Sequence, residues 1–387
     1  MTIEPAIWAE IDLGCIRRNT RRIKEMLAPG TLLLAVVKAN AYGHGEVEGA
    51  RAVLEGGADW LGVARVEEGV ALRAAGIESP ILLLAEPPRG ALELAVASDL
   101  TPTIYTEQTA QALAGLAAAR GVRVRAHMKV DTGMHRYGVP CEHAVGFLGL
   151  LKSLESIEVA GLWTHFAVAE EVTNPYTTMQ SKRFLELLDE LVPEDRVIRH
   201  MCNSAGAITL PSAHLDMVRA GIALWGIHPS PELAHLIELE PAMSLKSRIG
   251  MTKRLAAGEA ISYGQKYRMP RDGWVVTVPC GYADGLRRAL GNTGEVLIRG
   301  KRYRISGTIT MDHFLVDVGD DDLEVGEEVV ILGAQGQDRI TAQEMADRLG
   351  TIPYEVVCGI SARVPRVYKD SVPIGTEQPR ASQSAQP

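Results

Sequence analysis

Between Leu32 and Gly226 the hydrophobic positions form short apolar runs, separated by segments in which apolar residues recur every three to four positions. Short bounded apolar runs are typical of buried strands, and the second pattern is typical of amphipathic helices. The predicted strands are Leu32–Val37, Trp60–Ala64, Ile81–Ala85, Thr103–Tyr105, Val124–Val130, Val159–Trp163, Val197–Met201 and Met217–Ala223.

Helical patterns lie between these runs, at Val66–Ala75, Thr106–Ala119, His143–Leu154 and Thr178–Leu191. Repeated strand–helix units predict a parallel sheet with right-handed crossovers. Eight units of this size fit a (β/α)8 barrel. The rival is a doubly wound open sheet, but no Gly-x-Gly-x-x-Gly follows the first strand, which weakens a dinucleotide-binding version.

After about Leu233 the helical periodicity fades, and apolar runs are separated by glycine turns. This pattern predicts a mostly β second domain, with one helix over Thr341–Leu349 that ends at Gly350. The runs are Trp274–Val278, Glu295–Ile298, Tyr303–Ile309, His313–Val318 and Glu328–Leu332. We therefore predict an α/β protein with a barrel over residues 1–232, a β domain over 233–375 and a disordered polar tail over 376–387. In one interpretation the early segment 1–13 pairs with the β domain.

Composition narrows the class of protein. The 387 residues are enough for two domains, and a net charge of −8 does not suggest a nucleic-acid partner. The five cysteines are scattered without the spacing of a disulfide framework or a zinc site, which favours a reducing cytoplasm and no bound metal. No signal peptide and no apolar run long enough to span a membrane is predicted.

Polar residues follow several of the predicted barrel strands, at the rim where barrels carry their active sites. Lys38 ends the first strand, where burial on one side would lower its pKa and suit it to form an imine with a carbonyl cofactor. The alternative is a strand-end lysine that extends to solvent. The later strand ends contribute Lys129, Arg136, His165, Ser204, Arg219, Gly221 and Ile222.

These residue types suit a phosphorylated, carbonyl-bearing cofactor. The Ser204 and Tyr42 hydroxyls can donate to a phosphate, and Gly221 leaves room for the Gly221 and Ile222 amides to do the same. Arg136 can form a bidentate contact with a carboxylate or bind a phenolate oxygen.

The motifs resemble those of the alanine racemase family. The segment AVVKANAYGHG at Ala35–Gly45 is similar to the family's pyridoxal-phosphate signature, and further matches follow in the family's order across nearly the whole chain. They are Asp131–Met134, Thr164–Phe166, Asn203–Ala205, Arg219–Ile222, Leu245–Ser247, Ser262–Gly264, Gly281–Gly285, Thr310–Asp312, Tyr354–Glu355 and Arg363–Arg366.

The resemblance implies a head-to-tail homodimer in which each active site takes Lys38 from one subunit and Tyr263 from the other. It implies that Lys38 holds pyridoxal 5'-phosphate as an aldimine. Lys38 and Tyr263 would then act on opposite faces of the substrate α-carbon and interconvert L-alanine and D-alanine, supplying D-alanine for peptidoglycan. Lys38 is the base expected for the D-isomer and Tyr263 for the L-isomer.

Other roles also come from the resemblance. His165 would connect Tyr263 to Arg219, and Arg219 would face the pyridine nitrogen. Arg136 and the Met311 amide would bind the substrate carboxylate. Lys129 stands where the family often carries a carbamate, which would hold Arg136; the alternative is an unmodified lysine paired with Asp131 or another carboxylate.

Tyr282, Tyr354 and Asp312 match the family's entryway, and Tyr354 has a second expected role as a donor to the cofactor phosphate. Interface packing is the alternative for these tyrosines. The sequence departs from the family pattern at Trp225, where tyrosine is usual, at Glu170, where aspartate is usual in the entryway, and at Thr310 and His313.

Three alternative functions stay open. A racemase for serine or for several amino acids would share these motifs. A barrel-type pyridoxal-phosphate decarboxylase would need a glycine-triplet phosphate loop and an acidic partner for the ring nitrogen, whereas Arg219 fills that position here. A non-catalytic cofactor carrier would consist of the barrel alone, without the domain that contains Tyr263.

Overall fold

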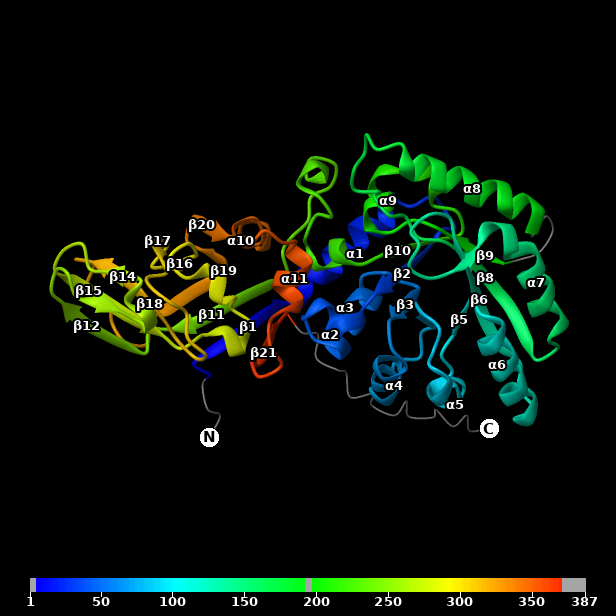
Figure 1. Ribbon diagram of the computed structural model, residues 1–387, viewed down its shortest axis with the longest axis horizontal. Coiled ribbons are helices and arrows are strands. Elements are labelled where there is room, and N and C mark those ends of the chain that lie inside the picture. The colour runs from blue at the N-terminus through cyan, green and yellow to red at the C-terminus, as the bar shows by residue number, and fades with distance from the viewer. Residues whose placement is uncertain (1–4, 192–196, 371–387) are drawn as a thin grey trace, which may run out of the picture.

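The computed structural model describes residues 5–191 and 197–370, and the predicted tail over 376–387 lies outside the described residues. The molecule is elongated, with a barrel at one end and a β-rich part at the other (Figure 1).

Eight parallel strands form the barrel. They pair in the orders β10-β2-β3-β4 and β5-β6-β8-β9. A parallel bridge from Leu82 to Thr101 joins the two sheets at one side, and the Asp216 N–H donates to the Arg199 carbonyl at the other. The strands are β2 (Leu32–Val36), β3 (Trp60–Val63), β4 (Ile81–Leu83), β5 (Thr103–Ile104), β6 (Val124–Asp131), β8 (Ile157–Trp163), β9 (Ile198–His200) and β10 (Met217–Ala220).

The barrel prediction is confirmed, and the open-sheet rival is wrong. Each predicted strand overlaps one observed strand, because parallel strands buried on both faces read as near-continuous apolar runs. A short strand, β7 (Val139–Pro140), pairs with β6 outside this order.

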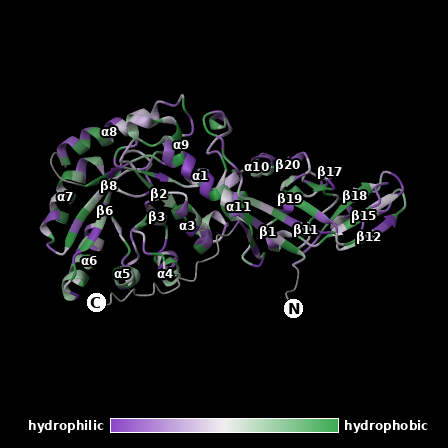
Figure 2. Ribbon diagram, turned by 180° about the vertical axis from the view of Figure 1, so that it is seen from behind, coloured by the Kyte–Doolittle hydropathy of each residue, from purple (hydrophilic) through white to green (hydrophobic). Residues whose placement is uncertain are grey.

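Helices cover the outside of the barrel and, in Figure 2, show both hydrophobic and hydrophilic positions along their length. This mixture follows from one face that packs on the strands and one that meets solvent. No helix within the described part of the chain is long and apolar enough to cross a membrane. The helices are α1 (Leu13–Met26), α3 (Glu46–Glu55), α4 (Val66–Ala74), α5 (Leu92–Ala97), α6 (Glu107–Ala119), α7 (Ala144–Ser153), α8 (Tyr176–Leu191) and α9 (Ser204–Thr209).

The β-rich part contains a seven-stranded sheet in the order β17-β16-β19-β11-β1-β21, with β20 paired to β19, together with the smaller sheets β12-β15-β18 and β13-β14. Its strands are β1 (Ile7–Asp12), β11 (Met243–Arg248), β12 (Met251–Leu255), β13 (Ala260–Ile261), β14 (Tyr267–Arg268), β15 (Gly273–Val278), β16 (Glu295–Ile298), β17 (Lys301–Arg304), β18 (Phe314–Gly319), β19 (Glu328–Gln335), β20 (Asp338–Ile340) and β21 (Arg366–Lys369).

Strand β1 belongs to this sheet although it precedes the barrel in the chain. It pairs antiparallel with β11 and parallel with β21, so both ends of the described chain meet in the β-rich part. We keep residue 232 as the proposed end of the barrel domain, since the last barrel strand precedes it and β11 follows it.

Two helices complete the β-rich part, α10 (Ala342–Leu349) and α11 (Pro353–Cys358). The Thr341 side chain accepts from the Glu344 amide at the start of α10, and Gly350 ends the helix in the left-handed conformation at φ 67°. Helix α11 packs beside the turn that follows β2, which brings its Tyr354 ring within 6.2 Å of the Tyr42 ring.

Candidate active site

A cavity of about 520 Å³ opens at the carboxyl ends of the barrel strands. It gathers most of the predicted site residues from separate strands and from α11. Those that line it are Lys38, Tyr42, Lys129, Arg136, His165, Glu170, Ser204, Arg219, Gly221, Ile222 and Tyr354.

Lys38 opens a left-handed turn, labelled α2 (Lys38–Tyr42) in Figure 1. Ala39, Asn40, Ala41 and Tyr42 have φ between 53° and 55°, and L-residues pay roughly 1–2 kcal/mol each in this conformation. Backbone bonds, such as the one from the Ala41 N–H to the Val37 carbonyl at 2.8 Å, hold the turn in place. Such strain collects at functional sites, here directly after Lys38.

The environment of Lys38 favours a neutral amine. Burial lowers the pKa of Lys38, and the positive charge of Arg136 lowers it further. A lysine that forms an imine must first lose its proton, so the direction of the shift is the one that this chemistry requires.

Arg219 is buried in the cavity wall, and its hydrogen-bond partners are neutral groups. Its guanidinium donates to the Thr164 carbonyl at 2.8 Å, to His200 Nδ1 at 2.9 Å and to His165 Nδ1 at 3.1 Å. Burial lowers the pKa of Arg219 to about 9, which still leaves it charged at neutral pH. The cation therefore faces the cavity without a carboxylate among these bonded partners.

His200 and His127 form a buried chain behind Arg219. Because a guanidinium only donates, His200 Nδ1 accepts, and its Nε2–H must donate to His127 Nδ1, 2.9 Å away. Burial lowers the pKa of His127 to about 3 and that of His200 well below its usual value, so both rings are neutral. The sequence pattern did not predict this pair.

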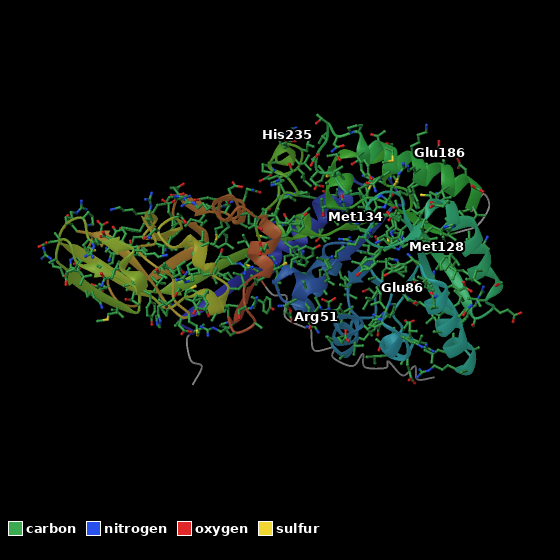
Figure 3. All side chains as sticks on the ribbon, viewed as in Figure 1. Arg51, Glu86, Met128, Met134, Glu186 and His235 are labelled. Carbon is green, nitrogen blue, oxygen red and sulfur yellow. The ribbon has the colours of Figure 1, made fainter. Side chains whose placement is uncertain are left out.

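A signal for one member of the pair was present. His127 lies two residues before Lys129 and therefore on the same face of β6, with Met128, labelled in Figure 3, between them. A Cβ at Gly161 of the neighbouring strand would collide with the His127 ring, so that glycine makes room for it.

Lys129 lies near other cations. Its Nζ sits 4.3 Å from the centre of the Trp163 ring, and burial together with Arg219 and Arg136 lowers the pKa of Lys129 to about 7. Asp131 Oδ2 contacts His135 Nδ1 at 3.2 Å, and the negative charge of Asp131 partly offsets the lowering of the Lys129 pKa, so the unmodified, carboxylate-paired lysine stays an alternative.

The opposite side of the cavity is rich in hydroxyls and offers a backbone amide. The Gly221 N–H donates to Ser204 Oγ at 2.8 Å, which places this amide and the Ser204 hydroxyl together, and the expected bond from the amide to a phosphate stays a prediction. The role of Gly221 is to leave space, because a Cβ there would collide with the Tyr42 hydroxyl. Ile222 opens a 3-10 turn, whose first N–H has no partner within the turn.

Four predicted residues do not line this cavity. Tyr263 begins the turn between β13 and β14 and is 74% exposed, and the label of β14 lies on the side of the β-rich part away from the barrel in Figure 1. Met311 is 52% exposed and Tyr282 is 43% exposed. Asp312 forms an ion pair with Arg363, in which Arg363 Nη2 lies 2.6 Å from Asp312 Oδ1. One chain therefore does not bring Tyr263 to Lys38.

Comparisons with known proteins show the family to which the chain belongs. Residues 11–229 match the family model "Alanine racemase, N-terminal domain", and residues 242–368 match "Alanine racemase, C-terminal domain". An alanine racemase of Symbiobacterium thermophilum is 48% identical over 366 residues, which cover 93% of this chain and 96% of the relative.

Solved structures of alanine racemases are also similar to this chain. An alanine racemase of Clostridium difficile 630 has a TM-score of 0.91 and 41% identity, with 95% of this chain and 97% of that chain covered. An alanine racemase of Bartonella henselae, described with covalently bound pyridoxal phosphate, has a TM-score of 0.84 and 28% identity, with 95% and 100% covered. The chain belongs to the alanine racemase family of isomerases.

Proposed function

We propose that this chain interconverts L-alanine and D-alanine with two bases, Lys38 of one subunit and Tyr263 of a second subunit. The observation that carries the proposal is the division of the site. Lys38, Arg219 and His165 line one cavity at the barrel rim, whereas Tyr263 is exposed and does not line it. Two opposed bases suit racemisation because a proton must leave one face of the α-carbon and arrive at the other.

The cavity fits pyridoxal 5'-phosphate, the group named for the Bartonella henselae relative. Lys38 would hold its aldehyde, and the Ser204, Tyr42 and Tyr354 hydroxyls with the Gly221 and Ile222 amides would hold its phosphate. When bound, the group withdraws electrons from the substrate and acidifies its α-proton. Arg219 fits the ring nitrogen as a pure donor that keeps its own proton.

The chain's own residues divide the remaining work. Lys38, with its pKa lowered by burial, moves a proton at the face used by the D-isomer. Tyr263 moves a proton at the opposite face, where His165 would connect its hydroxyl to Arg219. The His165 Nδ1 contact with Arg219 leaves Nε2 as the donor side of that ring.

Substrate selection rests on charge and on the entrance. Arg136 and the Met311 amide would bind the alanine carboxylate. Glu170 lines the cavity beside Tyr354, whereas Tyr282 and Asp312 would reach the entrance from the second subunit. We infer a homodimer in the cytoplasm whose D-alanine product supplies peptidoglycan.

Lys129 is proposed to carry a carbamate. A neutral amine attacks carbon dioxide, and the pKa of about 7 keeps a large share of Lys129 neutral at the pH of the cytoplasm. The new nitrogen–carbon bond forms with loss of one amine proton and leaves an anion. That anion would lie near Arg136 and Arg219, the cations that disfavour the protonated lysine.

Incubation with L-alanine in heavy water tests the function. We expect loss of optical activity together with deuterium at the α-carbon and no carbon dioxide. Release of carbon dioxide would move the chain to the decarboxylase alternative, and α-deuterium from L-serine at a similar rate would indicate a broader racemase. Absence of both reactions would contradict catalysis.

A further inference from the structure

The strained turn that follows Lys38 is anchored by a carboxylate from the next strand–helix unit of the barrel. The first amide of the turn, the Ala39 N–H, donates to Glu68 Oε1 at 2.7 Å. Glu68 lies in the first turn of α4, which follows β3, so this bond connects the ends of two neighbouring parallel strands, β2 and β3. Glu68 is half-buried and does not line the cavity of about 520 Å³, whereas Ala39 does.

The two oxygens of this carboxylate have different partners. Glu68 Oε2 accepts from the Ala64 N–H at 2.8 Å and from the Arg65 N–H at 3.0 Å. Arg65 is the residue that precedes α4, and a glutamate that binds its amide in this way caps the start of the helix. The cap uses Oε2 alone. The bond from Oε1 to the Ala39 amide is therefore additional to the cap and needs an explanation of its own.

The other end of the turn is held from the β-rich part. Arg366 of β21 donates to the Gly43 carbonyl at 3.0 Å. That bond fixes the end of the turn but not its beginning, where one peptide group joins Lys38 to Ala39. Because peptide groups are planar, the orientation of this one sets ψ of Lys38 together with the φ of 53° at Ala39. Glu68 binds the N–H of this peptide group.

Glu68 also acts on Lys38 through its charge. Burial and the positive charge of Arg136 lower the pKa of Lys38, whereas the negative charge of Glu68 raises it. The carboxylate is therefore close enough to influence the amine as well as the backbone beside it. A small displacement of a reacting amine is costly, because catalysis depends on groups held in line with the reacting atoms.

We propose that Glu68 is a positioning residue that acts on Lys38 through the Ala39 N–H. It holds the peptide group after Lys38 in the left-handed turn and so directs the amine into the cavity. This role rests on the proposed function, in which Lys38 is the base for D-alanine and Tyr263 the base for L-alanine. Loss of the contact should therefore affect the two isomers unequally.

Exchange of α-protons by the full-length, cofactor-loaded protein in heavy water tests this role. In Glu68→Gln the amide oxygen can keep the Ala64 and Arg65 bonds, and its NH₂ group then faces the Ala39 N–H, so the anchor is lost while the helix cap stays. Exchange of D-alanine should slow about tenfold, and exchange of L-alanine less than about threefold. Glu68→Asp keeps the charge but withdraws the oxygen from the Ala39 amide, and it should produce the same asymmetry.

Circular dichroism of the bound imine gives a readout that does not depend on turnover. Its ratio to the absorbance depends on the orientation of the imine, and this ratio should change in Glu68→Gln and in Glu68→Asp. Glu67→Gln removes a charge at the neighbouring exposed position and should change neither readout.

A second control matches the loss of amide contacts. Glu86, labelled in Figure 3, accepts from the Thr106 N–H at 2.6 Å directly before α6, as Glu68 does before α4. Glu86→Gln should lose stability in denaturant unfolding and leave both the exchange asymmetry and the dichroism ratio unchanged.

Two results would overturn this role of Glu68. One is a Glu68→Gln variant that exchanges D-alanine as fast as the native chain. The other is equal slowing of both isomers with an unchanged dichroism ratio, as expected of a residue that only supports the fold. Tyr263→Phe, measured in parallel, tests the proposed function separately. If Tyr263→Phe slows both isomers equally, the two-base scheme fails; a changed dichroism ratio in Glu68→Gln would then still support the positioning of Lys38, and an unchanged ratio would overturn it.

Discussion

The rim of the barrel, which holds Lys38 and Arg219, and the exposed residues Tyr263 and Met311 of the β-rich part, which we call the tip, differ in how many contacts they make within the chain. At the rim, Arg219 is 3% exposed and has four acceptor atoms from the same chain within 3.1 Å. At the tip, Tyr263 is 74% exposed and Met311 is 52% exposed. Large side chains left open to solvent in this way are typical of surfaces that meet a partner.

The difference indicates that a single chain contributes two separate parts to the proposed site. One is the Lys38 cavity, which is packed within the chain, and the other is Tyr263, which is exposed. The rim needs burial, because burial lowers the pKa of Lys38 and isolates the Arg219 cation. The tip needs exposure, because Tyr263 would have to enter the Lys38 cavity of a second subunit.

Removal of the rim's central residue should have the largest effect. Lys38→Ala should reduce racemisation at least about 10⁴-fold, because both the cofactor attachment and one base are lost. The absorbance of the bound imine should also disappear. Lys253→Ala, an exposed lysine of β12, is the control. Retention of the imine absorbance in Lys38→Ala would refute the assignment.

Removal of the Tyr263 hydroxyl should slow α-proton exchange of one alanine isomer more than of the other. Tyr263→Phe should slow α-proton exchange of L-alanine about 10²- to 10⁴-fold and exchange of D-alanine much less, because Lys38 still serves the other face. Exchange in heavy water measures both rates. Equal losses for the two isomers would count against a pair of separate bases.

Mixing these two variants tests the sharing of sites directly. In a one-to-one mixture of Lys38→Ala and Tyr263→Phe chains, about half of the dimers are mixed, and each mixed dimer contains one intact site. The mixture should therefore recover about a quarter of native activity. If each chain built a complete site alone, mixing would restore nothing.

The sequence predicted this division only in part. Strand periodicity placed Lys38 and Arg219 at one rim, since parallel strands end at the same edge. It did not predict the left-handed turn at Ala39–Tyr42, because alanine and tyrosine have no local preference for positive φ and the turn is held by its surroundings. It also missed the bond between His127 and His200, which lie on strands separated by β8 and meet only in the folded barrel.

Lys129 should make the free energy of unfolding depend on pH. Its pKa falls from 10.5 to about 7 on folding, so between these values the unfolded chain binds more protons and stability rises with pH. Lys129→Met should therefore be more stable than the native chain by about 1–3 kcal/mol near pH 7 in carbon-dioxide-free buffer. This advantage should shrink toward pH 10. Denaturant unfolding at several pH values measures it.

Bicarbonate separates the modified from the unmodified lysine. With ¹³C-bicarbonate at pH 8, the native chain should gain stability and show a carbamate carbon signal that Lys129→Met lacks. Lys253→Met is the control for added salt and for loss of a lysine. A native chain that gains neither signal nor stability would contradict the carbamate.

Loss of His200 from the buried histidine pair should have a smaller effect on kcat/KM than loss of Lys38 or Tyr263. His200→Asn should lower kcat/KM about tenfold, because Arg219 Nη1 loses its acceptor and the guanidinium can turn away from the cavity. His214→Asn also removes a buried histidine, whose Nε2–H donates to the Ala207 carbonyl at 2.9 Å, but His214 lies outside this chain of contacts. It should lose similar stability and keep its activity. Equal loss of activity in both variants would leave only a structural role for His200.

Substitution of Glu170 at the cavity entrance should have the smallest effect on catalysis. Glu170 lines the cavity, and its negative charge adds to the effect of burial in raising the pKa of Tyr354. Glu170→Asp keeps the charge and withdraws it by one methylene, so kcat for alanine should change less than threefold while KM changes in the same range. Glu170→Gln removes the charge and should lower the pKa of Tyr354, which ultraviolet titration of the tyrosines can follow. A tenfold loss of kcat in Glu170→Asp would mean that the entrance takes part in positioning the reacting groups, and the contrast between a rigid rim and an open tip would then be too simple.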